Sequence, residues 1–239
     1  ELIAVLCAQF GNYGLTPKHS SFYTHCIVVN HYFEGGFYPR GGPEVIAKNI
    51  IPIIEESGGR VLVGKKVKKI LIEDRKACGV IMENGIVIKA KNIISSAGVN
   101  NTFRKLLTPE LALCTRLNNI GYSDSLIQLF IGLNQSGEKL GLKSENIWEL
   151  PDRNYDKLSE DFNKDPIKHS TISFIACPSS KDQDWKNRYP NKSTAVVMCP
   201  TKWTTFSQWN KNKNDEYKKF KKVLEKKLLN IFFKRYPKA

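Results

Sequence analysis

Two regions of the chain carry apolar residues at helical spacing. After a Gly-Gly pair, isoleucines recur every three or four residues from Ile46 to Ile54, which predicts a helix that Gly58-Gly59 ends. Pro52 lies inside this pattern, so we expect a kink or an early end of that helix. Near the C-terminus the same repeat predicts a helix over 215–236. Shorter helical segments are predicted over 2–10, 101–107 and 109–117.

Runs rich in Val, Ile and Leu predict strands in much of the remaining chain. Glu83-Asn84-Gly85 separates two of these runs and predicts a hairpin. In the run 24–33, His25 and His31 would share one face and lie about 20 Å apart along a strand. The two histidines would therefore not share a metal ion, and each is expected to be a hydrogen-bonded strand residue. The predicted strands are 24–33, 60–63, 66–72, 77–82, 86–90, 92–95, 125–133, 171–176 and 194–199, whereas 134–169 is predicted to be polar and irregular.

Composition and charge narrow the class of protein. The 239 residues are 41% hydrophobic and 25% charged, which is a globular balance. The net charge is +14, and much of the lysine lies in 211–234. Aromatic residues do not alternate with arginine, so no nucleic-acid partner is expected. The basic C-terminal helix either packs its apolar face on a sheet, which we favour, or lies on an anionic membrane.

Metal-binding patterns are absent from the sequence. The six cysteines form no CxxC pair and no Cys/His cluster at zinc spacing, so free, buried thiols and no metal are expected. Asp182 and Asp184 lie in a polar loop, where we expect solvated charges rather than a pair of catalytic carboxylates. Because the first residue is Glu1 and not methionine, we expect the chain to be part of a longer protein.

Two points along the chain are candidates for a ligand site. Gly41 and Gly42 let the backbone turn sharply or approach a ligand closely. Ser95, Ala97 and Gly98 follow a predicted strand with small side chains, before a helix whose N-terminus favours phosphate. At each point the alternative is an ordinary joint between a helix and a strand. For Ser95, Ala97 and Gly98 the pattern alone favours such a joint over a ligand site.

Longer stretches of the sequence resemble a known family. The resemblance runs from end to end and is most specific in the glycine-rich stretch before the first long helix and in the stretch around Cys177. It is carried by Asn30-His31-Tyr32, Gly35-Gly36-Phe37-Tyr38-Pro39-Arg40-Gly41-Gly42, Gly58-Gly59-Arg60-Val61-Leu62, Ser95-Ser96-Ala97-Gly98 and Phe174-Ile175-Ala176-Cys177-Pro178-Ser179-Ser180-Lys181-Asp182. The chain thus resembles the retinol-saturating reductases, within the carotenoid-isomerase and phytoene-desaturase group of FAD flavoproteins.

The resemblance implies a fold and a set of site residues. The implied fold class is α/β, or α+β for the chain overall. Residues 38–122 would form a partial FAD/NAD(P)-binding Rossmann-like domain, and residues 1–37 and 123–239 would form portions of an antiparallel-sheet substrate domain. It implies that certain backbone positions contact FAD and that two side chains near the flavin are candidates for catalysis. The implied cofactor-binding residues are Gly41, Gly42, Val67, Ser95, Ala97 and Gly98, and the catalytic candidates are Tyr38 and Arg40, whose alternative role is structural.

The resemblance also implies an activity. It implies saturation of one C=C bond of all-trans-retinol or a related apolar polyene, with FAD as cofactor and NAD or NADP as candidate reductant, at the endoplasmic reticulum membrane. The alternatives are a carotenoid or lipid desaturase or isomerase, and a non-catalytic, membrane-peripheral lipid-binding protein. The sequence departs from the family pattern because it contains neither the Gly-rich phosphate-binding motif nor the C-terminal flavin-contacting segment. We therefore expect this chain alone neither to retain flavin nor to catalyse the reaction.

Overall fold

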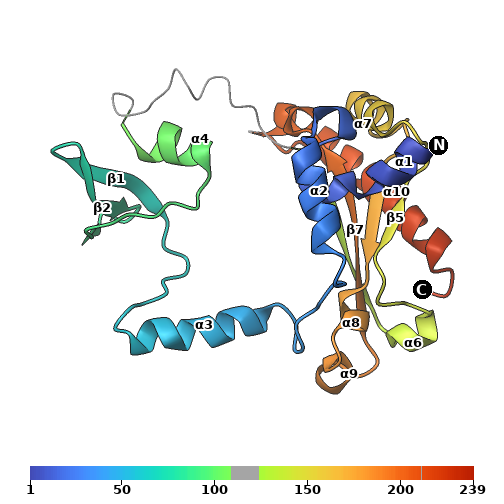
Figure 1. The fold of residues 1–239 in the computed structure, drawn as a ribbon, viewed down its shortest axis with the longest axis horizontal. Coiled ribbons are helices and arrows are strands. Elements are labelled where there is room, and N and C mark those ends of the chain that lie inside the picture. The colour runs from blue at the N-terminus through green and yellow to red at the C-terminus, as the bar shows by residue number, and fades with distance from the viewer. Residues whose placement is uncertain (109–123, 211) are drawn as a thin grey trace. The chain divides into compact units, whose positions relative to one another are not determined.

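A computed structural model describes residues 1–108, 124–210 and 212–239. The chain divides into a larger unit, Glu1–Asn49 with Ser123–Ala239, and a smaller unit, Ile50–Tyr122. Each unit has its own antiparallel sheet, which confirms the α+β class (Figure 1). The predicted domain boundaries at 37/38 and 122/123 stay a prediction.

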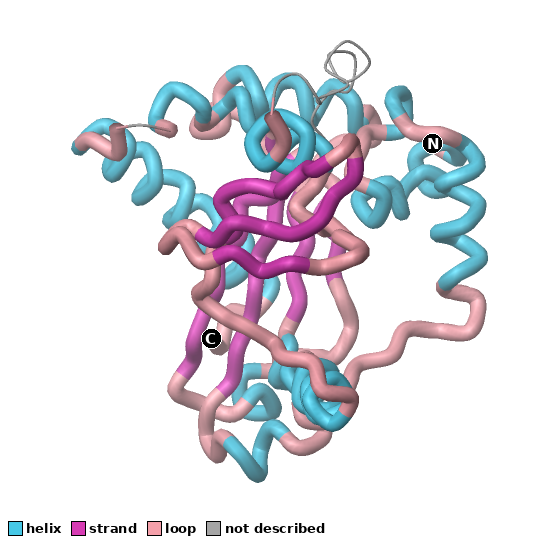
Figure 2. The backbone as a smooth tube through the Cα atoms, turned by 90° about the vertical axis from the view of Figure 1, so that its left-hand side faces the viewer, coloured by secondary structure: helices cyan, strands magenta, loops and turns pink. Residues whose placement is uncertain are grey.

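The larger unit is built on a four-stranded sheet. Its strand order is β4 (Ser125–Leu133), β7 (Ser193–Thr201), β6 (Ser173–Ala176) and β5 (Ile147–Glu149), and every neighbouring pair is antiparallel. Figure 2 draws the strands of this sheet, like those of the smaller unit, in magenta. The register of the central pair runs from Ser125 opposite Thr201 to Leu133 opposite Ser193. Burial alternates along β4, as expected for a strand with one face against a core.

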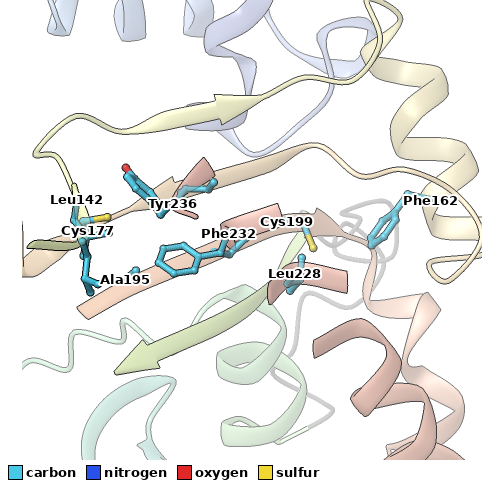
Figure 3. Close-up of a cluster of buried hydrophobic side chains, with 11 residues drawn as sticks. Leu142, Phe162, Cys177, Ala195, Cys199, Leu228, Phe232 and Tyr236 are labelled. Carbon is cyan, nitrogen blue, oxygen red and sulfur yellow. The ribbon is translucent and has the colours of Figure 1, made fainter. Parts of the chain in front are cut away.

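The C-terminal helix α10 (Asp215–Arg235) covers this sheet with its apolar face. Leu228 and Phe232 of α10 pack with Cys199 of β7 and with Phe162 of α7 (Tyr155–Lys164) in one core cluster (Figure 3). Asn214 caps the helix, because its side chain accepts a hydrogen bond from the Tyr217 amide at 3.0 Å. The prediction that this helix packs its apolar face is therefore confirmed.

A second core cluster joins the N-terminal segment to the rest of the larger unit. The segment comprises α1 (Leu2–Cys7) and the 3₁₀ helices Ala8–Tyr13 and Pro17–His19. Phe10 stacks on Tyr155 with ring centroids 5.0 Å apart, and the Tyr155 hydroxyl donates a 2.8 Å hydrogen bond to the Ala4 carbonyl. Contacts between residues about 150 positions apart thus fix α1 beside α7.

The smaller unit holds the three-stranded sheet β1 (Val67–Glu73), β2 (Lys76–Met82) and β3 (Val87–Lys89). The predicted hairpin joins β2 to β3, with the Gly85 amide donating to the Met82 carbonyl at 3.0 Å. A short helix α4 (Val99–Asn101) continues into a π-helical turn, Thr102–Leu106, where a helix was predicted. Helix α3 (Glu44–Glu56) contains the residues at which the chain passes from the larger unit to the smaller one.

Several sequence predictions are wrong. The run 24–33 is not a strand but helix α2 (Phe22–His31), and neither 60–63 nor 92–95 is a strand. A strand needs a neighbour to satisfy its amides, whereas a helix satisfies them internally, and neither described sheet includes this segment. The helix α3 continues past Pro52 to Glu56, so an early end is also wrong. The helix predicted over 109–117 lies outside the described residues.

The segment 134–169 is more regular than predicted. It contains α6 (Gly137–Leu140), β5 and α7. The two helices begin at capping residues: Ser136 accepts from the Lys139 amide and Asn154 accepts from the Lys157 amide at 3.0 Å. Ser and Asn are residue types typical of helix starts, so both caps could have been recognised in the sequence. The remaining elements are α8 (Pro178–Lys181), α9 (Trp185–Arg188) and the 3₁₀ helices Trp203–Thr205 and Ser207–Trp209.

Candidate functional site

The Gly41-Gly42 turn is held by a loop far away in the sequence. Both glycines have positive φ, +91° and +84°, a conformation that side chains disfavour. A Cβ atom at Gly41 would lie 2.8 Å from Cγ1 of Val45. The Gly42 amide closes the turn on the Pro39 carbonyl at 3.0 Å, and α3 begins at Glu44. The turn therefore requires glycine at position 41 both for its φ angle and for space.

Asp182 is the centre of the contact between the turn and the loop that joins β6 to β7. Its carboxylate accepts hydrogen bonds from the Gly41 amide at 2.8 Å and from the Asp184 amide at 3.0 Å, and it pairs with the Arg188 guanidinium. Only 1% of this side chain is exposed. Burial alone would raise the pKa of Asp182, but the two amides and Arg188 outweigh it and hold that pKa below its ordinary value. The prediction that Asp182 is a solvated loop charge is wrong.

A second arginine–aspartate pair lies beside the first. Arg40 donates from Nε and Nη2 to the two carboxylate oxygens of Asp184, at 2.8 and 2.9 Å. This hydrogen bonding and the charge of Arg40 lower the pKa of Asp184. Arg188 also lies 5.4 Å from the ring centroid of Tyr189, in a cation–π arrangement. The Tyr-Pro-Arg-Gly-Gly stretch and the loop after Cys177 therefore form one ion-paired corner, which we call the Asp182 corner (Arg40–Glu44 and Asp182–Arg188).

Tyr38 and Arg40, the predicted catalytic candidates, differ in their surroundings. Burial, followed by the charge of Asp182, raises the pKa of Tyr38 above its ordinary value, so its hydroxyl stays protonated at neutral pH. Arg40 donates hydrogen bonds to both carboxylate oxygens of Asp184, which corresponds to the structural role given above as its alternative. A catalytic role for either residue stays a prediction.

The other predicted cofactor-binding residues lie in the smaller unit. Val67 begins β1 opposite Met82. Ser95 hydrogen-bonds Thr102 through their hydroxyl oxygens at 2.7 Å, and the Ala97 carbonyl accepts from Asn101 at 2.9 Å. The structure brings Ser95, Ala97 and Gly98 together at the start of α4, whereas Gly41 and Gly42 belong to the larger unit. Contact of these two groups with one flavin stays a prediction.

The backbone at Gly98 fits close approach of a cofactor. Gly98 has a φ of +82°, and a Cβ atom built there meets no atom within 4 Å. Open space of this kind is what a backbone needs in order to lie against a ring system or a phosphate. At Gly42 a Cβ atom would be in ordinary contact with Arg188 at 3.6 Å and Asp182 at 3.8 Å, so the space beside Gly42 is already bounded by these side chains.

A large apolar groove opens in the larger unit between α1, the turn after it and α2. Its volume is about 980 Å³, which is in the upper part of the range of small-molecule sites. The lining is mostly aliphatic and aromatic side chains: Ile3, Leu6, Pro17, Phe22, Ile27, Val29 and Phe33. Several of them are exposed hydrophobic residues, and such patches mark binding surfaces. We call this feature the α1–α2 groove.

Polar chemistry in the α1–α2 groove is concentrated in one pair. The hydroxyl oxygen of Tyr13 lies 3.1 Å from Nδ1 of His25. Burial, and to a smaller extent Cys7, raises the pKa of Tyr13. Sequence reasoning missed this pair, because it assigned His25 to a strand. The helical phase of 22–31 would have placed His25 on the same face as Phe22 and Val29, which also line the groove.

The described residues form neither a metal-ligand cluster nor a membrane-spanning helix. Within these residues no three His, Cys, Asp or Glu side chains converge as metal ligands would. No helix in the described ranges combines the length and apolar character needed to cross a bilayer. Of the described cysteines, Cys177 and Cys199 are buried free thiols, as predicted, but Cys26 is exposed; Cys114 lies outside the described residues.

Comparison with known proteins adds the family. The family described as flavin containing amine oxidoreductase matches residues 6–219. The chain is similar to an all-trans-retinol 13,14-reductase of Danio rerio, at 38% identity over 100% of this chain and 42% of the relative. It is also similar to an inactive all-trans-retinol 13,14-reductase of Danio rerio, at 31% identity over 99% and 42%, and to a chloroplastic prolycopene isomerase of Daucus carota, at 25% over 87% and 32%.

The chain thus spans less than half the length of these relatives. The family match nevertheless covers most of the chain, including both stretches that meet at the Asp182 corner and the α2 side of the α1–α2 groove. The chain belongs to the flavin-containing amine oxidoreductase family.

Proposed function

We propose that this chain is part of an FAD-dependent oxidoreductase that saturates one C=C bond of all-trans-retinol or a related polyene. The observation that carries the proposal is the 38% identity, over the whole chain, to a protein named all-trans-retinol 13,14-reductase. The family match supports a flavin cofactor. When bound, the flavin supplies the hydride for the reduction.

The chain's own residues would bind and orient the two reactants. The α1–α2 groove offers an apolar space of about 980 Å³ for the polyene. The Asp182 corner holds the Gly41-Gly42 turn in one conformation, which would present a fixed backbone surface to the flavin ring. Gly98 and its neighbours in the smaller unit would present backbone to other parts of the cofactor.

The finer parts of the proposal are the reductant and the location. NAD or NADP would reduce the flavin, and the protein would associate peripherally with the endoplasmic reticulum membrane. The exposed lysines of α10 support surface association, because their charge attracts anionic lipids while the apolar face of the helix stays packed.

The test uses the protein expressed from its complete coding sequence. It is incubated without oxygen with all-trans-retinol and a chemical reductant that bypasses the natural electron donor, and the products are separated and weighed by mass spectrometry. A product two mass units heavier than retinol is expected. Flavin-loaded protein that leaves retinol unchanged, and also leaves other retinoids unchanged, contradicts the proposal.

Two other functions remain alternatives with specific support. The prolycopene isomerase similarity supports isomerisation or desaturation of a carotenoid, which would change the shape or remove hydrogen rather than add it. The similarity to a relative named inactive supports a non-catalytic lipid-binding role. Carotenoid turnover without retinol reduction would favour the first alternative, and polyene binding without retained flavin would favour the second.

A further inference from the structure

We propose that Tyr13 is the proton donor of the reduction and that His25 returns the proton to it. The inference rests on the function proposed above, and it assigns the acid that this reaction requires. Saturation of a C=C bond adds a hydride to one carbon and a proton to the other. An apolar polyene brings no acidic group of its own, so the proton must come from the protein or from water that enters the site.

The position of Tyr13 fits this role. It lines the α1–α2 groove among hydrocarbon side chains, and it is half-buried beside the second core cluster. Burial raises the pKa of Tyr13, so the hydroxyl is protonated at neutral pH and the phenolate left by donation is disfavoured until a neighbour returns a proton to it. No Asp, Glu, Lys or Arg lines the groove, and the other titratable lining residues of the described chain are Cys7, Cys26 and His25.

His25 distinguishes Tyr13 from the two thiols. Its Nδ1 lies 3.1 Å from the Tyr13 oxygen, within reach of a proton transfer. The ring is held on two sides, edge-on to Tyr13 with centroids 6.0 Å apart and stacked on Phe22 at 6.0 Å. Among the described residues none hydrogen-bonds to Nε2, and the His25 side chain is half-buried. Neither Cys7 nor Cys26 has a comparable side-chain partner among the described residues.

The hydride and the proton would add to the two carbons of one double bond. A bound, reduced flavin would supply the hydride to one carbon and, with it, the two electrons of the reduction. The other carbon receives the proton of the Tyr13 hydroxyl as the π bond breaks and two C–H bonds form. The resulting phenolate takes the proton of Nδ1 from His25 while Nε2 takes a proton from solvent hydronium, so solvent is the final source of the proton. The pair is then neutral with the imidazole proton on Nε2, and exchange of that proton through solvent to Nδ1 readies the pair for the next turnover.

The test compares Tyr13→Phe with the matched control Tyr23→Phe in the protein expressed from its complete coding sequence. Tyr23 lies on the same helix as His25, is 74% exposed and does not line the groove. Turnover of retinol by Tyr13→Phe should fall about 100-fold or more, as expected for loss of a general acid. Retinol binding, measured by its fluorescence without reductant present, should change less than about twofold because the ring remains.

A further readout separates chemistry from structure. In deuterated water the unaltered protein should turn over more slowly, and this solvent isotope effect should be lost or altered in His25→Gln, which removes the relay but keeps a polar side chain. If Tyr13→Phe turns over retinol at the wild-type rate, Tyr13 is not the proton donor, and the reductase function proposed above still stands. Parallel loss of retinol binding also overturns it, because Tyr13 would then only position the substrate. Absence of turnover in the unaltered protein contradicts both the proposed function and the donor role.

Discussion

Replacement of Asp182 by alanine should destabilise the larger unit far more than the same change at Asp184. Asp182→Ala removes a buried carboxylate that three donors share: the Gly41 amide, the Asp184 amide and the Arg188 guanidinium. Loss of one partner of a buried ion pair costs 3–5 kcal/mol in general. The Arg188 side chain is 32% exposed and can recover part of its hydration, so the lower end applies and we expect a loss of about 3 kcal/mol.

The assay is denaturant unfolding followed by tryptophan fluorescence. All four tryptophans lie in the larger unit, so their emission reports on that unit. In a thermal melt of the same variant, a loss of about 3 kcal/mol corresponds to a melting temperature lowered by roughly 6–12 °C for a unit of this size. Asp184→Ala is the control, because its partner Arg40 is 70% exposed and such pairs contribute little. Equal effects of the two substitutions, or an Asp182→Ala protein within 1 kcal/mol of wild type, would refute the reasoning.

The same carboxylate predicts a dependence of stability on pH. The folded state holds the pKa of Asp182 below its unfolded value, so the folded protein binds its proton less readily than the unfolded chain does. Its contribution is therefore complete above the ordinary carboxyl pKa and is lost as the pH falls through the lower, folded pKa. The difference in unfolding free energy between wild type and Asp182→Ala should shrink as the pH is lowered through that window, and a constant difference would contradict the assignment.

The remaining predictions concern the turn, a buried hydroxyl and the thiols. Gly41→Ala should lower the unfolding free energy by about 2 kcal/mol, because alanine is strained at a φ of +91° and its Cβ would press on Val45; an unchanged denaturation midpoint would contradict this. Ser173→Ala should raise the unfolding free energy by about 1 kcal/mol, since its hydroxyl is fully buried and finds no partner among the described residues; a lower melting temperature would show that the hydroxyl is satisfied. Burial raises the pKa of Cys199 to about 11, so this thiol should react with a thiol reagent only after unfolding. The exposed Cys26 should react in the folded protein, and peptide mapping by mass spectrometry distinguishes the two sites.

The sequence by itself determined the elements whose pattern is local. Helices α3 and α10, the hairpin between β2 and β3 and the strands β4, β6 and β7 are where apolar periodicity and turn residues placed them. The reason is that helical repeat, strand alternation and caps act over a few neighbouring residues. The family resemblance could likewise be read from short stretches, because those stretches are contiguous in the chain.

Only the tertiary structure decided how separate stretches meet. The run 22–31 is rich in residues that favour strands, yet it is a helix, since β propensity depends on a neighbouring strand that this segment lacks. Asp182 reads as a solvated loop charge until the Gly41 amide, 141 residues away in the chain, and Arg188 enclose it. Tyr13 and His25 form a pair only because α2 is helical and packs beside the preceding turn. Hydrogen bonds and burial between distant residues depend on the packed fold, and no local pattern encodes them.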